Sequence, residues 1–378
     1  MDQNRTTAEQ EKRMLDQFAQ LTEIDRESFD ERKAADYLKE VFAGEGISLQ
    51  EDHSAEKTGS NAGNLYGIFP STEEGAEPVL LCAHMDTVKP GKGKKAIFQE
   101  DGRITGNGKA VLGADDGTSI SCILEAIREI KEEGKPHRLV ELLFTTAEEA
   151  YTVGASAFDV RRIKSKRAYA ADIDNVMGCY SMQEPTLLSF RVEVKGRSAH
   201  AGFEPEKGIH SLLAASMAIA RLPEGRVEGD TTFNIGLIHG GTATNAIPED
   251  TVLEGEIRSA VHEKALAFYE EMKHVFEEEA LKIGAKASVE KTVHLTAYHV
   301  PEDSKALLAY KKVLGDLGIG LIPYPCFGGS DINVLRRNGI DGLCIGSSMH
   351  FAHTTREYAE KEEMMQLKEI FKELMLLS

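Results

Sequence analysis

Residues 78–86 read Pro-Val-Leu-Leu-Cys-Ala-His-Met-Asp, and this stretch decides the fold class. Its apolar run, Val79–Ala83, has no polar break and is followed at once by His84 and Asp86. A run of this length predicts a strand buried on both faces, which is typical of sheets covered by helices on each side. Comparable strands are predicted at residues 64–69, 139–145 and 168–171.

Helical periodicity separates these strands. Apolar residues recur at helical spacing within residues 8–24 and 29–42, and a stripe of isoleucine and leucine follows Asp115 between residues 120 and 130. Strands that alternate with helices predict an α/β domain built on a central sheet.

The pattern changes near residue 188. The following residues predict a strand, a helix, two strands, a long helix and a strand, at residues 189–195, 206–222, 232–239, 251–258, 262–283 and 287–294. That order is βαββαβ, the ferredoxin-like arrangement. After residue 301 the α/β pattern resumes, with a helix at 304–317, a strand at 342–346 and a closing helix from 360. We therefore expect one domain from residues 1–187 and 297–378, with a second domain, residues 188–296, inserted into it.

The overall composition narrows the functional classes. The chain has 378 residues and a formal net charge of -18, a balance that repels phosphate backbones and argues against nucleic-acid binding. No stretch approaches the roughly 18 apolar residues that a membrane span requires, and the polar first residues lack the apolar core of a signal peptide. The five cysteines are scattered and odd in number, as expected of free thiols in a reducing compartment. The sequence therefore predicts a cytoplasmic protein.

Polar residues gather where the predicted strands end, which is where open α/β sheets hold their ligands. They are His84 and Asp86, Asp115 and Asp116, Glu148 and Glu149, Asp172 and Asp174, and His350 and His353. Each alone has an ordinary explanation, such as a helix N-cap, an ion pair or a surface loop. Together, carboxylates at one sheet edge would repel one another unless a cation lay between them. Histidine with carboxylate is a ligand set that suits zinc, and Asp115 is the best-placed carboxylate to lie between two metals.

Other chemistries fit less well. The sequence contains no G-x-S-x-G nucleophile motif and no G-x-G-x-x-G at a strand–helix turn. Gly106-Asn107-Gly108-Lys109 is followed by Ala110 and therefore fails as a phosphate-binding loop.

Seven motifs, in order, give the chain a resemblance to a known family. They are LLCAHMDTV, LGADDGTS, TTAEEAYTVGA, AADID, GRSAHAG, GGTATNAIP and HFAHTTREY. The chain resembles, essentially from end to end, the two-zinc metallopeptidases that include peptidase T, carboxypeptidase G and acetylornithine deacetylase. LGADD and HTTREY are most similar to the peptidase T, or tripeptidase, branch.

The resemblance implies a role for each matching residue. One zinc ion would be held by His84, Asp115 and Asp172, and the other by Asp115, Glu149 and His353. Cobalt or manganese would also suit these ligands. Asp86 would orient the ring of His84, and Glu148 would be the general base.

The inserted domain corresponds in this family to the lid and dimerisation domain, so the resemblance implies a homodimer. His200 would stabilise the oxyanion from the partner subunit, and Asn245 and Arg258 would grip the substrate. The segment Gly328-Gly329-Ser330-Asp331 resembles a loop that faces the substrate in the family, and Ser330 is the residue expected to bind it. Gly117 departs from the pattern, since several branches have lysine there. Asp174 competes with Asp172 as a ligand and His350 with His353; the flanking residues favour Asp172 and His353.

These observations predict a zinc aminopeptidase that acts on small peptides, of tripeptidase type. An N-acyl-amino-acid amidohydrolase with the same metal chemistry is the alternative. A catalytically inactive relative is disfavoured because every ligand and the base are present.

Overall fold

The computed structural model describes residues 2–174 and 176–376. The chain divides into two compact units. Unit 1 consists of residues 1–182, 299–325 and 330–378, and unit 2 of residues 183–298 and 326–329. None of the helices among the described residues has the length and apolar character needed to cross a bilayer.

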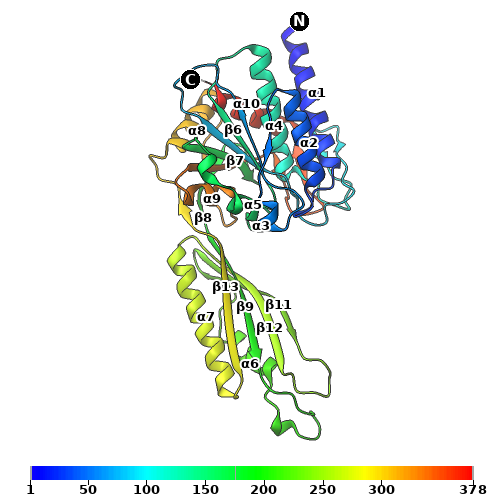
Figure 1. Cartoon of the computed structure of the whole chain (residues 1–378), viewed down its shortest axis with the longest axis vertical. Helices are drawn as coiled ribbons and strands as arrows, with labels where there is room; N and C mark the ends of the chain where they lie inside the picture. The colour runs from blue at the N-terminus through cyan, green and yellow to red at the C-terminus, as the bar shows by residue number, and fades with distance from the viewer. Residues whose placement is uncertain (1, 175, 377–378) are drawn as a thin grey trace. The chain divides into compact units, whose positions relative to one another are not determined.

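A nine-stranded mixed sheet is the centre of unit 1 (Figure 1). Its strands are β1 (Gln50–Glu51), β2 (Leu65–Phe69), β3 (Val79–His84), β6 (Val140–Thr145), β7 (Arg167–Ile173), β8 (Cys179–Glu184), β14 (Tyr298–His299), β15 (Ile322–Pro325) and β16 (Asp341–Gly346). The order is β1-β2-β6-β3-β7-β16-β8-β14, with β15 beside β8. The central pairs β6–β3, β3–β7 and β7–β16 are parallel, so these strands end at the same edge of the sheet.

Helices cover the sheet and bury its apolar residues. They are α1 (Asp2–Glu23), α2 (Arg32–Gly44), α3 (Ala55–Thr58), α4 (Ala114–Glu133), α5 (Val153–Ala157), α8 (Lys305–Asp316), α9 (Asp331–Arg337) and α10 (Lys361–Met375). Alternate strand residues such as Leu81 and Leu142 share one core with α1, α2, α4, α8 and α10. The α9 helix packs on β7 and β16, and Ile332 from it contacts Gly342.

The α4 helix shows how the sequence sets these elements. Its predicted stripe, from Ile120 to Ile130, is fully buried, and α1 and α10 pack against the helix. Gly134 ends it in the left-handed conformation, where its N–H bonds to the carbonyls of Ile130 and Lys131. A small sheet lies beside this core, formed by β17 (Met349–His350), β18 (Tyr358–Glu360), β5 (Arg103–Thr105) and β4 (Ile97–Phe98) in that order.

Unit 2 is a five-stranded antiparallel sheet with two helices. Its elements are β9 (Thr186–Lys195), α6 (Ser211–Ile219), β10 (Gly225–Glu228), β11 (Thr231–Gly240), β12 (Asp250–Ser259), α7 (His262–Lys282) and β13 (Lys286–Leu295). The order β11-β12-β9-β13 is that of a ferredoxin-like fold, and β10 adds an edge strand. The α7 helix runs along β13 and β9 and contacts α6 (Figure 1).

The expected α/β fold class, with a ferredoxin-like domain inside the chain, is confirmed. Two details differ. The α6 helix covers only Ser211–Ile219, because residues 205–207 form a separate short 3-10 turn that begins at Pro205. The edge strand β10 was not expected, since four residues are too few to show an alternating pattern.

Candidate metal centre

The carboxyl ends of the parallel strands bring the expected metal ligands together. His84 is the last residue of β3, Asp172 lies near the end of β7, and Glu149 follows β6. Asp115 lies in the first turn of α4, and His353 in the loop between β17 and β18. The peptide bond between Asp115 and Asp116 is cis.

Asp115 lies between the two histidines. Its Oδ1 is 2.9 Å from Nε2 of His84, and its Oδ2 is 3.2 Å from Nε2 of His353. Each histidine has a further carboxylate: Asp172 Oδ1 is 3.8 Å from His84 Nε2, and Glu149 Oε2 is 2.9 Å from His353 Nε2. The five residues therefore form two overlapping groups, each with one histidine and one carboxylate of its own, and with Asp115 in both.

Glu148 lies in the same cluster. Ligand atoms of His84, Glu148 and Asp172 lie within 4.8 Å of one another. Burial raises the pKa of the Glu148 carboxyl, and the charge of Asp172 raises it further. The pKa of Asp172 is raised by burial and by Asp115 in the same way. Carboxylates that raise one another's pKa in a buried site mark a place where a cation would be stabilised.

The donor set fits a metal pair. Glu149 Oε1 is buried and has no hydrogen-bond partner among the described residues, although Oε2 of the same carboxylate faces His353. A buried oxygen without a partner costs free energy unless something absent from the chain itself satisfies it. The contacts of His353 with Asp115 and Glu149 raise the pKa of its imidazole to about 11, which shows how strongly these carboxylates stabilise a positive charge. Histidine nitrogen with carboxylate oxygen is the donor chemistry of zinc.

Asp86 binds both the ring of His84 and the loop that carries Glu148 and Glu149, here called the glutamate loop. It is fully buried, and its Oδ1 is 3.3 Å from Nδ1 of His84 and accepts the N–H of Glu148 over 3.0 Å. Its Oδ2 accepts from the Ser28 hydroxyl over 2.7 Å and from the Glu149 N–H over 3.3 Å. The Asp86 backbone carbonyl also lies 3.2 Å from His84 Nδ1, so that nitrogen faces two acceptors. With Nδ1 as the donor, Nε2 is left with a lone pair for a metal.

The two competing residues lie outside the cluster. Asp174 is exposed, and its carboxylate accepts the N–H of Ala352 over 3.0 Å. His350 pairs with Glu363, with 2.7 Å between Nε2 and Oε2, and its ring stacks on Tyr358. The structure thus brings Asp172 and His353 into the group.

Ser330 and Asp331 lie at the start of α9. The Ser330 side chain caps this helix by accepting from the Ile332 N–H, and only 2% of the residue is exposed. Asp331 belongs to the same loop, for which the resemblance implied a position facing the substrate, but it was given no role of its own. Its carboxylate accepts from the Thr145 hydroxyl over 2.5 Å, and burial raises its pKa to about 6. Its Oδ1 has no hydrogen-bond partner within the part of the chain that the structure describes.

Three expected residues belong to unit 2. His200 Nδ1 accepts from the N–H groups of Gly202 and Phe203, and the Asn245 carbonyl accepts from the Ala201 N–H over 2.9 Å. Arg258 lies on β12. Its guanidinium donates to both oxygens of Glu256 and, over 3.1 Å, to the Phe327 carbonyl.

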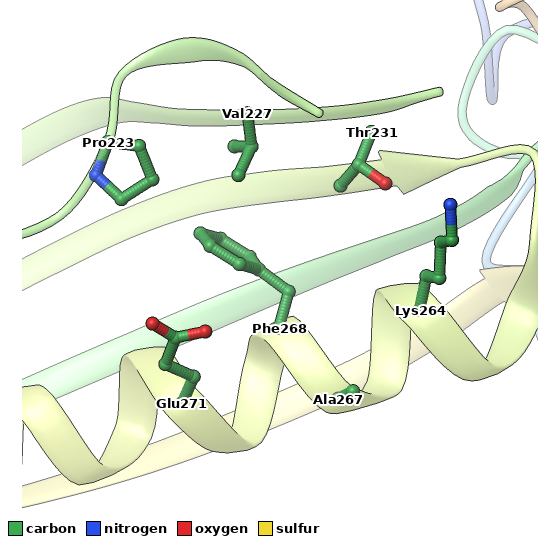
Figure 2. Close-up of a pocket in the computed structure, with 7 residues that line it drawn as sticks. All are labelled: Pro223, Val227, Thr231, Lys264, Ala267, Phe268 and Glu271. Atoms are coloured by element: carbon green, nitrogen blue, oxygen red, sulfur yellow. The ribbon is translucent and has the colours of Figure 1, made fainter. Parts of the chain in front are cut away.

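A cavity of about 350 Å³ in unit 2 carries no comparable chemistry (Figure 2). Figure 2 shows Phe268 projecting from α7 between Lys264 and Glu271. These two are the charged residues among the described residues that line the cavity. Lys264 already pairs with Asp230 over 2.9 Å. None of the expected site residues lines this cavity.

Comparisons with known proteins show which family this chain belongs to. Residues 183–284 match the family described as peptidase dimerisation domain, and residues 64–203 match peptidase family M28. The Bacillus subtilis protein YqjE is 35% identical over 360 residues, which cover 95% of this chain and 96% of YqjE.

Two solved structures are similar over almost their whole length. Aminopeptidase PepT from Bacillus cereus is 34% identical with a TM-score of 0.88, over 97% of this chain and 98% of that one. A tripeptidase from Staphylococcus aureus is 31% identical with a TM-score of 0.92, over 97% of each chain. The chain therefore belongs to the peptidase T-like branch of the two-zinc metallopeptidase family and is a metallopeptidase.

Proposed function

We propose that this protein is a di-zinc aminopeptidase of tripeptidase type, which hydrolyses an amide bond of small peptides. The observation that carries the proposal is the position of Asp115, whose two oxygens face two different histidines. His84, Asp115 and Asp172 would hold one zinc ion, and Asp115, Glu149 and His353 the other. Two bound zinc ions would lower the pKa of a water molecule and polarise the amide carbonyl.

Glu148 would move the proton in this reaction. Its carboxylate would accept a proton from the attacking water and deliver it to the leaving nitrogen. Asp86 holds the backbone of Glu148 and the ring of His84 through one oxygen, so it would fix the base relative to the first ligand. The burial that raises the pKa of Glu148 also suits a group that must both take and return a proton.

Residues 1–187 and 297–378 would form the catalytic domain, and residues 188–296 the lid and dimerisation domain. His200 would donate to the oxyanion, and its hydrogen bonds support this role. Because Nδ1 accepts backbone N–H groups, the neutral ring carries its proton on Nε2, where it can be donated. Asn245 and Ser330 would contact the substrate. Arg258 would bind a substrate carboxylate only by exchanging its present partners, Glu256 and Phe327.

A homodimer would form through unit 2. Leu237 and Ile238 on β11 are 52% and 46% exposed, and Leu213 on α6 is 49% exposed. Among the described strands, β10 covers the outer edge of β11 only as far as Phe233. An apolar edge of this kind is suited to pairing with another chain. Ile238→Glu should shift the protein from dimer to monomer in sedimentation velocity, whereas Leu281→Glu, at a 76%-exposed position on α7, should not.

We also propose a cytoplasmic location. All five cysteines are free, and four of them are buried, which fits a reducing compartment.

The test is hydrolysis by the zinc-loaded protein of free-amine di- and tripeptides, their N-acetylated forms, and acetylated amino acids. Cleavage that requires a free amine would support the aminopeptidase. Cleavage of acylated substrates only would move the function to the deacylase alternative and leave the metal site as proposed.

Two variants test the assignment of the base. Glu148→Gln should abolish turnover while two metals per chain remain, and Glu149→Ala should lose a metal. Substantial activity in Glu148→Gln would show that another group is the base.

A further inference from the structure

Arg26 is fully buried beside the loop that follows His84. It lies between α1 and α2, and its carbonyl accepts the N–H of Thr87 over 2.9 Å. The next residue, Glu27, forms a parallel bridge with Thr87. Arginine is almost never fully buried unless it is paired, so the burial of Arg26 must be explained by the groups that its guanidinium contacts.

The guanidinium of Arg26 joins two loops. Its Nη1 donates to the carbonyls of Met85 and Asp86 over 2.7 and 3.0 Å, and its Nη2 donates to the carbonyl of Gly113 over 2.7 Å. Met85 directly follows the ligand His84, and Gly113 precedes the ligand Asp115 by two residues. One side chain therefore spans the two loops whose ligands meet at 2.9 Å.

Two glycines leave room for this side chain. A Cβ atom at Gly113 would lie 2.9 Å from Arg26 Nη2, and a Cβ atom at Gly117 would lie 2.8 Å from the same nitrogen. Either atom would push the guanidinium away from its acceptors. Several branches of the family have lysine at the position of Gly117. In this chain the guanidinium of Arg26 fills the space next to Gly117 that a side chain there would enter.

Glu357 binds the backbone of the same segment, residues 113–115. Its carboxylate accepts the N–H of Gly113 over 2.8 Å and the N–H of Asp115 over 3.0 Å, and only 2% of the residue is exposed. In the segment from Gly113 to Asp115, the Arg26 guanidinium therefore donates to one backbone carbonyl, and the Glu357 carboxylate accepts from two backbone N–H groups. Burying both charges is costly, and it is offset only when their hydrogen bonds are made.

We propose that Arg26 is a positioning residue of the metal centre, which fixes the spacing of the loops that carry His84 and Asp115. The inference rests on the proposed function, because it assigns Arg26 a task in metal binding. Arg26→Met keeps most of the volume and removes all three bonds. We expect it to weaken zinc binding by about 10- to 100-fold, as changes to groups that orient metal ligands do. The value of kcat should fall while KM changes little.

Zinc dissociation constants measured by competition with a chromophoric chelator test this proposal. Arg128→Met is the matched control, because Arg128 is also largely buried and pairs with Glu45 over 2.8 Å and Glu125 over 3.7 Å, neither of which is a proposed ligand. It should lose stability and keep the zinc affinity of the wild type. Arg26→Lys should fall between the wild type and Arg26→Met, since lysine keeps the charge without the planar fork.

Gly117→Ala gives an independent test should Arg26→Met not fold. Alanine favours a helix over glycine, so this variant should fold, yet its Cβ displaces the guanidinium and should weaken zinc binding. In the Arg26→Met background the same change should cause no further loss. Wild-type zinc affinity in Arg26→Met, or in Gly117→Ala where the former does not fold, would overturn the inference. Wild-type protein that binds no zinc would instead overturn the proposed function, and the inference with it.

Discussion

Replacing Asp86 by asparagine tests whether its carboxylate orients both His84 and the glutamate loop. The change keeps the shape of the side chain and removes its charge. One oxygen remains to face His84 Nδ1 and the Glu148 N–H, while the other becomes an NH2 group facing Ser28 and Glu149. The Ser28 hydroxyl can rotate and accept from this group, but the Glu149 N–H cannot.

The contacts set the size of the effect. One buried N–H without an acceptor costs about 1–3 kcal/mol. The remaining hydrogen bonds change from charge-assisted to neutral, which removes about 1 kcal/mol more. We therefore expect Asp86→Asn to lower the free energy of unfolding of the metal-free protein by about 2–4 kcal/mol, and to weaken zinc binding by about 10- to 100-fold.

Urea unfolding of the metal-free protein and a zinc titration measure the two effects. Asp52→Asn is the matched control, since the Asp52 carboxylate also accepts several hydrogen bonds, from Ser54 and Asn64, and faces no proposed ligand. It should lose stability and keep its zinc affinity. If both variants bound zinc equally well, the orienting role of Asp86 would be refuted.

Three further results are expected. Removing zinc by chelation should lower the thermal midpoint, because a ligand at 1,000 times its dissociation constant adds about 4 kcal/mol to the folded state; an unchanged midpoint in differential scanning calorimetry would contradict this. Glu129→Gln should destabilise the protein by about 3 kcal/mol in urea unfolding, because it leaves the ammonium groups of Lys368 and Lys372, both nearly fully buried, without their shared carboxylate; each lysine keeps a second carboxylate, which limits the loss. Burial raises the pKa of Glu51, but Arg32 and other donors outweigh it and lower the pKa to about 2. The Glu51 carboxylate should therefore contribute fully to the stability of the fold above the ordinary pKa of a glutamate, and this contribution should be lost as the pH falls toward 2. Glu51→Gln should accordingly lower the free energy of unfolding at pH 6 and lower it much less at pH 2.

Local patterns were sufficient for most of the fold. The apolar run that ends at His84 is a buried strand, and the stripe after Asp115 is the buried face of α4, because both depend on residues close together in the sequence. The same patterns placed the polar residues at the strand ends. Asp174 remained a competitor of Asp172 in the sequence, although the flanking residues favoured Asp172. In the structure Asp172 lies within β7 with its carboxylate 3.8 Å from His84, whereas Asp174 lies beyond the strand and accepts from the Ala352 N–H.

The supporting residues had no such signal. Arg26 binds backbone carbonyls, which every residue has, so nothing in the sequence near Met85 or Gly113 identifies it as their partner. Glu357 binds backbone N–H groups in the same way. The small sheet of β4, β5, β17 and β18 was also missed, because strands of two or three residues are too short to show a period.

The position of β16 in the sheet affects the order in which the chain can fold. This strand, Asp341–Gly346, lies between β7 and β8, which are neighbours in the sequence but not in the sheet. β7 pairs in parallel with β3, which precedes it, and with β16, which follows much later. During synthesis at ~5–20 residues per second, β16 is made on the order of ten seconds after β7. His353 emerges later still. The nascent chain therefore carries an open strand edge through the whole synthesis of unit 2, the period in which it is most exposed to aggregation and most dependent on chaperones.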